Sequence, residues 1–199
     1  MPIPNIIAVI FDFDDTLTDD PMSMFLAKHK NKGVDPRSFW QERNDLVKQG
    51  WDPTLGYLHL LLKYVDRGKI PPLTSKILKD FGRTLKPYPG LRKLFKELRY
   101  IGSQYRCDVE FYIVSGGIQE MIEGFPLRSE FKAVWGCQLG SEKPGGELRY
   151  IKSTVSFTEK TRYLFVINKG LGPKQLASNP YLVNEEISNR RNAGYPSVI

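Results

Sequence analysis

Near its N-terminus the chain contains an unbroken apolar run, residues 6–11 (IIAVIF), which gives way at once to the acidic segment of residues 12–15 (DFDD). A short run rich in β-branched residues is typical of a strand covered on both faces, as in a parallel sheet flanked by helices. The run is too short to cross a bilayer and lacks the basic leader and cleavage site of a signal peptide. We therefore expect a buried parallel strand in a cytoplasmic protein that has no membrane partner.

A second apolar run, residues 109–114 (VEFYIV), ends in Ser115-Gly116-Gly117 and is followed by a further apolar pattern at residues 118–122. This order predicts a strand, a tight turn and the start of a helix. Ahead of it, an amphipathic helix is predicted by apolar residues at the spacing i, i+3, i+4 and i+7, namely Leu91, Leu94, Phe95 and Leu98. Helix, strand and helix in succession favour an α/β fold with a doubly wound, Rossmann-like parallel-sheet core, whose site lies at the carboxyl ends of the strands.

Residues 21–86 have the sequence features of helices rather than of strands. Asp35-Pro36 offers an N-cap followed by proline in the first turn of a helix. A helical stripe is predicted from the apolar residues Leu55, Leu58, Leu62 and Val65. We predict a small helical cap, residues 21–86, inserted after the first strand of a core formed by residues 1–20 and 87–199.

Less specific patterns predict further strands and helices. Residues 135–139 and 148–157 predict two strands joined by a turn, residues 163–167 a buried helix or strand, and residues 195–199 the beginning of a strand. Within the cap, the aromatic and histidine residues are expected to pack rather than to bind a ligand: His29, Phe39, Trp40, Trp51 and His59.

Composition excludes several classes of protein. The 199 residues are 41% hydrophobic and 26% charged, as in a globular domain. The net charge of +7 comes from lysines and arginines mixed with acids, without a recognised nucleic-acid-binding motif, so nucleic acid is an unlikely partner. The two cysteines, Cys107 and Cys137, are expected to be free thiols. The sequence does not determine the oligomeric state.

The acidic segment is the strongest candidate for chemistry. Residues two apart in an extended chain point to the same side, so Asp12 and Asp14 can face one small volume at the end of the strand. Two close carboxylates repel each other unless a cation or a proton intervenes, and Mg²⁺ binds through one or two carboxylates together with a substrate phosphate. The alternative is an acidic turn that caps a helix.

Three segments together resemble the haloacid-dehalogenase-like (HAD) superfamily. Residues 6–18 are similar to its first motif, DxDx[TV] after a hydrophobic strand, and residues 111–117 are similar to its second motif, a strand ending in Ser or Thr. Lys160 corresponds in order to the lysine of the third motif. The resemblance covers most of the chain and is strongest to the phosphoserine-phosphatase-like branch, in which a C1-type cap lies between the first two motifs.

The resemblance implies a Mg²⁺-dependent phosphatase that acts on a small phosphorylated metabolite. Asp12 would attack phosphorus and become an aspartyl-phosphate, and Asp14 would protonate the leaving oxygen and then activate water. Both residues would hold the Mg²⁺ ion, Asp14 through its backbone carbonyl. The second aspartate favours phosphoryl transfer over dehalogenation, because the haloacid dehalogenases lack it.

The other site residues follow from the same resemblance. Ser115 and the backbone N–H of Gly116 would hold the phosphoryl oxygens, and Lys160 would offset their charge and that of Asp12. Thr16 would support the first loop by hydrogen bonding. Lys143, which precedes a proline as in another HAD branch, is the alternative third-motif lysine.

The fourth motif of the superfamily, an acidic loop, is missing, because no aspartate follows Asp108. We expect the sequence to be truncated at its C-terminus, so that these 199 residues alone turn over slowly or not at all. A genuine stop codon directly after Ile199 would contradict this expectation. The alternative function is a non-catalytic phosphate-binding or regulatory domain that keeps the fold.

Overall fold

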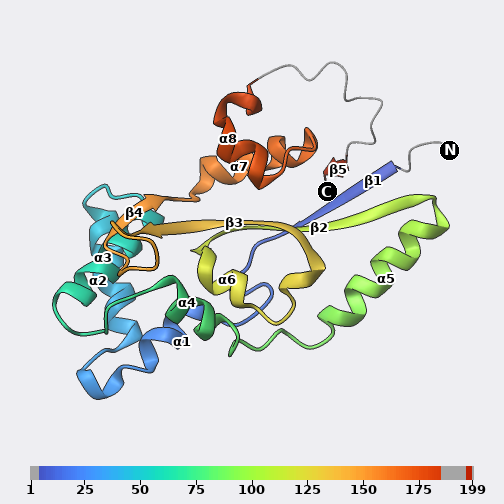
Figure 1. Ribbon diagram of the computed structural model, residues 1–199. Helices are drawn as coiled ribbons and strands as arrows, with labels where there is room; N and C mark the ends of the chain where they lie inside the picture. Colours follow the sequence, from blue (N-terminus) through green and yellow to red (C-terminus); the bar gives the residue numbers. More distant parts are fainter. Residues whose placement is uncertain (1–4, 185–195, 199) are drawn as a thin grey trace.

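The computed structural model describes residues 5–184 and 196–198. Within them the chain forms a five-stranded sheet in the order β4-β3-β2-β1-β5 (Figure 1). Strands β3, β2, β1 and β5 run parallel to one another, and β4 is antiparallel to β3. The strands are β1 (Asn5–Phe11), β2 (Cys107–Ile118), β3 (Phe131–Gly140), β4 (Tyr150–Ser153) and β5 (Pro196–Val198).

Helices cover both faces of this sheet, which confirms the doubly wound α/β fold. Helices α5 (Leu91–Gln104) and α6 (Gln119–Gly124) lie on one face, and α7 (Phe157–Asn168) and α8 (Pro173–Ser178) lie on the other (Figure 1). The predicted amphipathic helix is α5. Its fully buried Phe95 contacts an aromatic residue from each of three strands, with ring centroids 4.8–5.9 Å apart: Phe11, Phe111 and Phe131.

The first strand is found where the sequence predicts it, but its burial is lower than expected. Of the residues in β1 only Ala8 is buried, and residues 6, 7 and 9–11 are half-buried. On one side β1 pairs with β2 along its whole length, from Asn5 to Phe11. On the other side β5 pairs only with residues 6–8. The second half of β1 therefore has no strand beside it on that side in the described part of the chain.

Between β1 and α5 the chain is helical, as predicted. The segment contains α1 (Pro21–Ala27), the short 3₁₀ turn η1 (Lys30–Lys32), α2 (Pro36–Lys48), α3 (Pro53–Asp66) and α4 (Ser75–Gly82). Helices α1, α2 and α3 each start with the same device, an aspartate that accepts two backbone N–H groups and is followed by proline at the first helical position. These aspartates are Asp20, Asp35 and Asp52.

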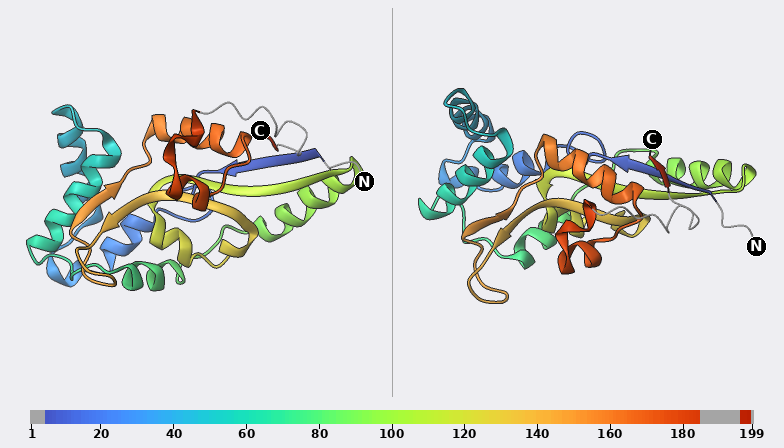
Figure 2. Two further views of the ribbon diagram at one scale, coloured as in Figure 1. Left: turned by 45° about the horizontal axis from the view of Figure 1, so that its top comes forward. Right: turned by 90° about the horizontal axis from the view of Figure 1, so that it is seen from above.

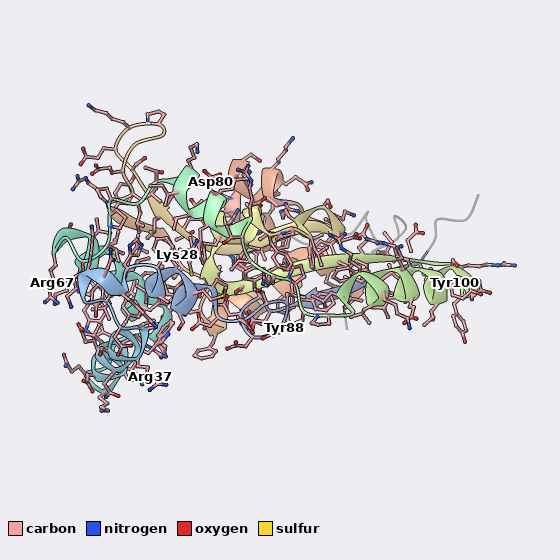
Figure 3. All side chains as sticks on the ribbon, turned by 90° about the horizontal axis from the view of Figure 1, so that it is seen from below. Lys28, Arg37, Arg67, Asp80, Tyr88 and Tyr100 are labelled. Carbon is pink, nitrogen blue, oxygen red and sulfur yellow. The ribbon has the colours of Figure 1, made fainter. Side chains whose placement is uncertain are left out.

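These helices are not equally placed relative to the sheet. Helices α1, α2 and α3 gather at the end of the molecule where the parallel strands finish, whereas α5 runs toward the opposite end (Figure 2). Accordingly Arg37 and Arg67 project at one end, and the exposed Tyr100 of α5 projects at the other (Figure 3). Helix α4 instead packs against α6, where a Cβ added to Gly82 would lie 2.0 Å from the carbonyl oxygen of Met121. The division into a core and a cap at residues 21–86 stays a prediction.

The buried face of α3 is rotated from the predicted stripe. Leu58 is fully buried, but Leu55 is 37% exposed and Leu62 and Val65 are half-buried. The buried positions of α3 are Gly56, Tyr57, Leu58, Leu60, Leu61 and Tyr64. Helix α3 contacts α2 as well as β4, so residues on two sides of the helix are enclosed.

Two further local predictions need correction. The serine-glycine segment is not a tight turn, because β2 continues through Gly117 to Ile118 with an irregular register against β3 after Val114. The strand predicted at residues 148–157 is shorter: β4 covers only Tyr150–Ser153, and Phe157 is the first residue of α7. The strand predicted at the C-terminus is found as β5, and residues 195 and 199 lie outside the described residues.

Other expectations are met. Residues 163–167 lie in α7, where Val166 and Ile167 are buried. Both cysteines are free, Cys137 buried and Cys107 half-buried. In the described part of the chain, every helix is too short or too polar to pass through a bilayer.

Candidate active site

The end of β1 and the start of α7 bring together two side chains that are 148 residues apart in the sequence. The Nζ atom of Lys160 lies 2.5 Å from Oδ2 of Asp12, and Oδ1 of Asp12 accepts the backbone N–H of Phe13 at 2.8 Å. The Asp12 side chain is 44% exposed, so one edge of its carboxylate remains open to solvent. Lys143, the alternative lysine, is exposed in the turn between β3 and β4.

Asp14 lies against the serine-glycine segment at the end of the neighbouring strand β2. A Cβ added to Gly117 would lie 3.0 and 3.2 Å from the two carboxylate oxygens of Asp14, and 3.3 Å from Oγ of Ser115. Ser115 is fully buried, and its Oγ accepts the backbone N–H of Gly117 at 2.9 Å. Because β1 and β2 are adjacent and parallel, Asp14 and Ser115 meet at one edge of the sheet, as the sequence predicts.

Several carboxylates lie close together around Asp14, at the carboxyl ends of β1 and β2. Burial, and then the nearby carboxylates of Asp20, Asp12 and Asp15, raise the pKa of Asp14 to about 7, whereas Lys160 acts in the opposite direction. A cation held between these carboxylates would relieve the repulsion. Within residues 5–184 and 196–198, no group of three or more His, Cys, Asp or Glu side chains is placed to hold a metal ion.

The two remaining predicted site residues have different surroundings. The carbonyl oxygen of Gly116 accepts the hydroxyl of Tyr57 at 2.6 Å and the thiol of Cys137 at 3.1 Å. Thr16 is exposed and its backbone N–H donates to the carbonyl of Phe13 at 3.3 Å. The buried threonine of this loop is Thr18, whose Oγ1 has no hydrogen-bond partner in the described part of the chain.

A pocket of about 200 Å³ opens beside Asp14. Its walls come from the first loop, helices α1, α2 and α3, and the β2–α6 segment: Phe13, Asp14, Pro21, Met22, Trp40, Arg43, Pro53, Thr54, Tyr57, Gly116, Gly117, Ile118 and Met121. Most of this lining is apolar.

The residues of α2 in this wall are ones that sequence reasoning missed. Trp40 is half-buried and packs against the core, as predicted, and it also lines the pocket. Its Nε1–H donates to Oγ of Ser23 at 2.7 Å. The guanidinium of Arg43 lies 5.1 Å from the Trp40 ring, and its buried Nε has no hydrogen-bond partner among the described residues. An aromatic residue and an arginine three positions apart on one helical face are the signal that could have indicated this wall.

Comparison with known proteins places the fold. No family model matches the chain. The chain is 33% identical over 189 residues to an uncharacterized protein of Borreliella burgdorferi, and the match covers 83% of this chain and 66% of that protein.

Solved structures with the same fold include a HAD family hydrolase from Salmonella enterica serovar Typhi, with a TM-score of 0.60, 13% identity, and coverage of 87% of this chain and 55% of that one. A phosphoserine phosphatase complex with bound substrate has a TM-score of 0.54 and 19% identity, and covers 86% of this chain and 75% of that one. A probable phosphoserine phosphatase from Vibrio cholerae has a TM-score of 0.52 and 16% identity, with coverage of 83% and 47%.

The fold is thus that of the haloacid-dehalogenase-like class of α/β proteins. Within this class, the chain has the fold of the phosphoserine phosphatases. It spans 55% of the length of the Salmonella hydrolase and 66% of that of the Borreliella protein.

Proposed function

We propose that the chain carries the active site of a Mg²⁺-dependent phosphomonoesterase that acts on a small phosphorylated metabolite through an aspartyl-phosphate. The observation that supports this most directly is the ion pair of Asp12 and Lys160 at 2.5 Å, beside Asp14 and the Ser115–Gly117 segment. A carboxylate with an open edge, a cation and a phosphoryl-binding segment at one sheet edge are the components that phosphoryl transfer needs.

The proposed reaction has two displacements at phosphorus. First, a carboxylate oxygen of Asp12 bonds to phosphorus as the bond to the leaving oxygen breaks, and Asp14 gives its proton to that oxygen. Second, water attacks the aspartyl-phosphate, its proton passes to Asp14, and phosphate leaves with Asp12 regenerated. The hydroxyl of Ser115, the N–H of Gly116 and the ammonium group of Lys160 would stabilise the charge on the phosphoryl oxygens.

The residues present are compatible with Mg²⁺. This ion prefers carboxylate, water and phosphate oxygens and needs only one or two carboxylates from the protein. Asp12 would supply a carboxylate oxygen and Asp14 its backbone carbonyl oxygen. Burial first, and then repulsion from neighbouring carboxylates that a cation would relieve, raises the pKa of Asp14. When bound, Mg²⁺ would neutralise charge on the phosphoryl group.

The pocket beside Asp14 is the place where the leaving group would sit, since Asp14 is the proposed proton donor to the leaving oxygen. Its volume of about 200 Å³ favours a small leaving group, and the aromatic wall of Trp40 and Tyr57 favours one with an apolar part. A negatively charged substituent on that group would pair with the Nε of Arg43, which has no hydrogen-bond partner among the residues that the structure describes. A screen of small phosphomonoesters, with and without such a substituent, tests this assignment.

The function is tested with p-nitrophenyl phosphate, with Mg²⁺ or with EDTA, on the longest chain that the gene encodes. Asp12→Asn should lower the rate by more than about 10³-fold, because the nucleophile is lost. Asp19→Asn is the matched control, since Asp19 is an exposed aspartate of the same loop that accepts the Tyr88 hydroxyl. A full rate in Asp12→Asn would reject the nucleophile. Phosphate binding without turnover in the unmutated chain would favour the regulatory alternative.

A further inference from the structure

Side chains from three other parts of the chain, Tyr57, Cys137 and Asp14, converge on the serine-glycine segment. The hydroxyl of Tyr57, on α3, donates to the carbonyl oxygen of Gly116 across 59 residues of sequence. On the far side of the same peptide unit, the N–H of Gly117 donates to Oγ of Ser115. Tyr57 is 8% exposed and Ser115 is fully buried, so water does not compete freely for these bonds.

The geometry of the peptide unit links these two hydrogen bonds. In a trans peptide the C=O of Gly116 and the N–H of Gly117 point in opposite directions and belong to one rigid, polarisable unit. A donor on the carbonyl oxygen increases the positive charge on the N–H, so successive hydrogen bonds strengthen one another. A bond made by Tyr57 therefore strengthens and orients the bond received by Ser115.

This arrangement also fixes the direction of the Ser115 hydroxyl. A serine hydroxyl has one proton to donate and two lone pairs to accept. Since Oγ accepts the N–H of Gly117, its own proton points away from that N–H. The Asp14 carboxylate lies on the same side of Gly117 as the Ser115 hydroxyl, so Ser115 is available as a donor on the side where the phosphoryl oxygens would lie.

A second donor on the Gly116 carbonyl comes from the sheet. The thiol of Cys137, on β3, donates to it at 3.1 Å and accepts the backbone N–H of Val155 at 3.2 Å. Both lone pairs of the carbonyl are then used, one by helix α3 and one by the sheet. Burial raises the pKa of the Tyr57 hydroxyl well above its ordinary value, which keeps the hydroxyl protonated as a donor.

We propose that the Tyr57 hydroxyl, acting through the Gly116–Gly117 peptide, is a positioning group for Ser115 and couples the seating of helix α3 to the phosphoryl-binding segment. An effect of Tyr57 on catalysis rests on the proposed phosphatase function. The two linked hydrogen bonds, from Tyr57 to Gly116 and from Gly117 to Ser115, do not depend on that function. A shift of α3 away from the sheet would remove the Tyr57 donor and leave Ser115 less well oriented.

The test compares Tyr57→Phe with Tyr64→Phe. Tyr64 is also a buried tyrosine of α3, and its hydroxyl donates to Glu42 at 2.7 Å, so its substitution removes a similar hydrogen bond without changing the serine-glycine segment. Three quantities are measured in the full chain: the NMR frequency of the Gly117 amide proton, the affinity for inorganic phosphate, and kcat and KM for p-nitrophenyl phosphate. The aromatic ring is kept in both variants, so ring-current shifts are matched.

Tyr57→Phe should move the Gly117 amide proton to lower frequency and lower both kcat and phosphate affinity roughly 10-fold, as expected for a group that orients a ligand-binding residue. Tyr64→Phe should leave the frequency of the Gly117 amide proton unshifted, and it should change kcat and the phosphate affinity by less than about 2-fold. An unshifted Gly117 amide in Tyr57→Phe, or equal effects in both variants, would overturn the proposal. If the longest chain that the gene encodes has no turnover, the phosphatase function fails, and the amide frequency and phosphate affinity still decide the role of Tyr57.

Discussion

At the scale of single residues, the site depends on side chains that local sequence places at the ends of strands. Asp12 follows β1, and Ser115 lies in the last part of β2, so their positions follow from where the apolar runs end. Gly117 matters for a different reason: an added Cβ there would lie 3.0 and 3.2 Å from the carboxylate oxygens of Asp14, closer than an ordinary contact. The reactivity of the Cys137 thiol depends on its burial and its hydrogen bonds in the folded chain.

The reactivity of Cys137 provides a test at this scale. Burial raises the pKa of its thiol to about 11, and only the thiolate is nucleophilic, so the native thiol should resist alkylation at pH 8 and react faster as pH rises toward 11. In a Cys107→Ser variant, Cys137 is the one remaining cysteine of the sequence. A short pulse of iodoacetamide at pH 8 should leave the folded variant unlabelled, whereas the same pulse in urea should add one label per chain. Rapid labelling of the native variant at pH 8 would contradict the buried, hydrogen-bonded position of Cys137.

At the scale of secondary-structure elements, the contact of α4 with α6 depends on small residues. Added Cβ atoms would lie 2.0 Å from the Met121 carbonyl at Gly82 and 2.1 Å from the Lys79 carbonyl at Gly124. Backbone atoms of the two helices therefore approach each other directly. This contact attaches the last helix of the 21–86 segment to the helix that follows the serine-glycine strand.

Gly82→Ala should consequently lower the free energy of unfolding by about 1–3 kcal/mol, since backbone atoms must move to make room. Gly56→Ala is the control, because an added Cβ in α3 would meet only side-chain atoms of Arg43 and Leu46 at 3.8 Å and beyond. It should raise the free energy by about 0.5–1 kcal/mol through helix propensity. Urea titrations followed by circular dichroism measure both. A neutral Gly82→Ala would mean that α4 and α6 are farther apart than the structure has them.

At the scale of the whole molecule, the order of the sheet decides which strand is protected. Strand β5 comes from the end of the chain and pairs with β1, the strand that leads to Asp12 (Figure 1). An edge strand without a partner presents free backbone N–H and C=O groups to other molecules. The pairing of β5 with residues 6–8 therefore shields the first half of β1 on that side.

Removing residues 185–199 should expose this edge of β1. We expect a lower Tm than that of the 199-residue chain and greater self-association as concentration rises, measured by thermal unfolding and by size-exclusion chromatography with light scattering. The 199-residue chain, studied at the same concentrations, is the reference. An unchanged Tm together with an unchanged elution profile would show that β5 contributes nothing to the stability of β1.

Much of the order of strands and helices could be predicted, because it depends on short stretches of sequence. The apolar runs of β1 and β2, the periodicity of α5 and the Asp35-Pro36 helix start each act over a few residues. The buried face of α3 could not be predicted in the same way, because two neighbouring elements from distant parts of the chain enclose it. The position of Trp40 in the pocket wall could not be predicted for a related reason. Periodicity shows that a side chain faces inward, and Trp40 does pack against the core, but periodicity does not show whether the side chain also borders a cavity.

The order of strands and helices, and the placement of two aspartates and a serine at strand ends, can be predicted from the amino acids alone, because backbone periodicity and turn chemistry are local properties. The folded chain is needed to see which lysine meets Asp12, how α3 reaches the Gly116 carbonyl, and which residues line the pocket. Those contacts join residues up to 148 positions apart. They depend on packing, which no local pattern in the chain specifies.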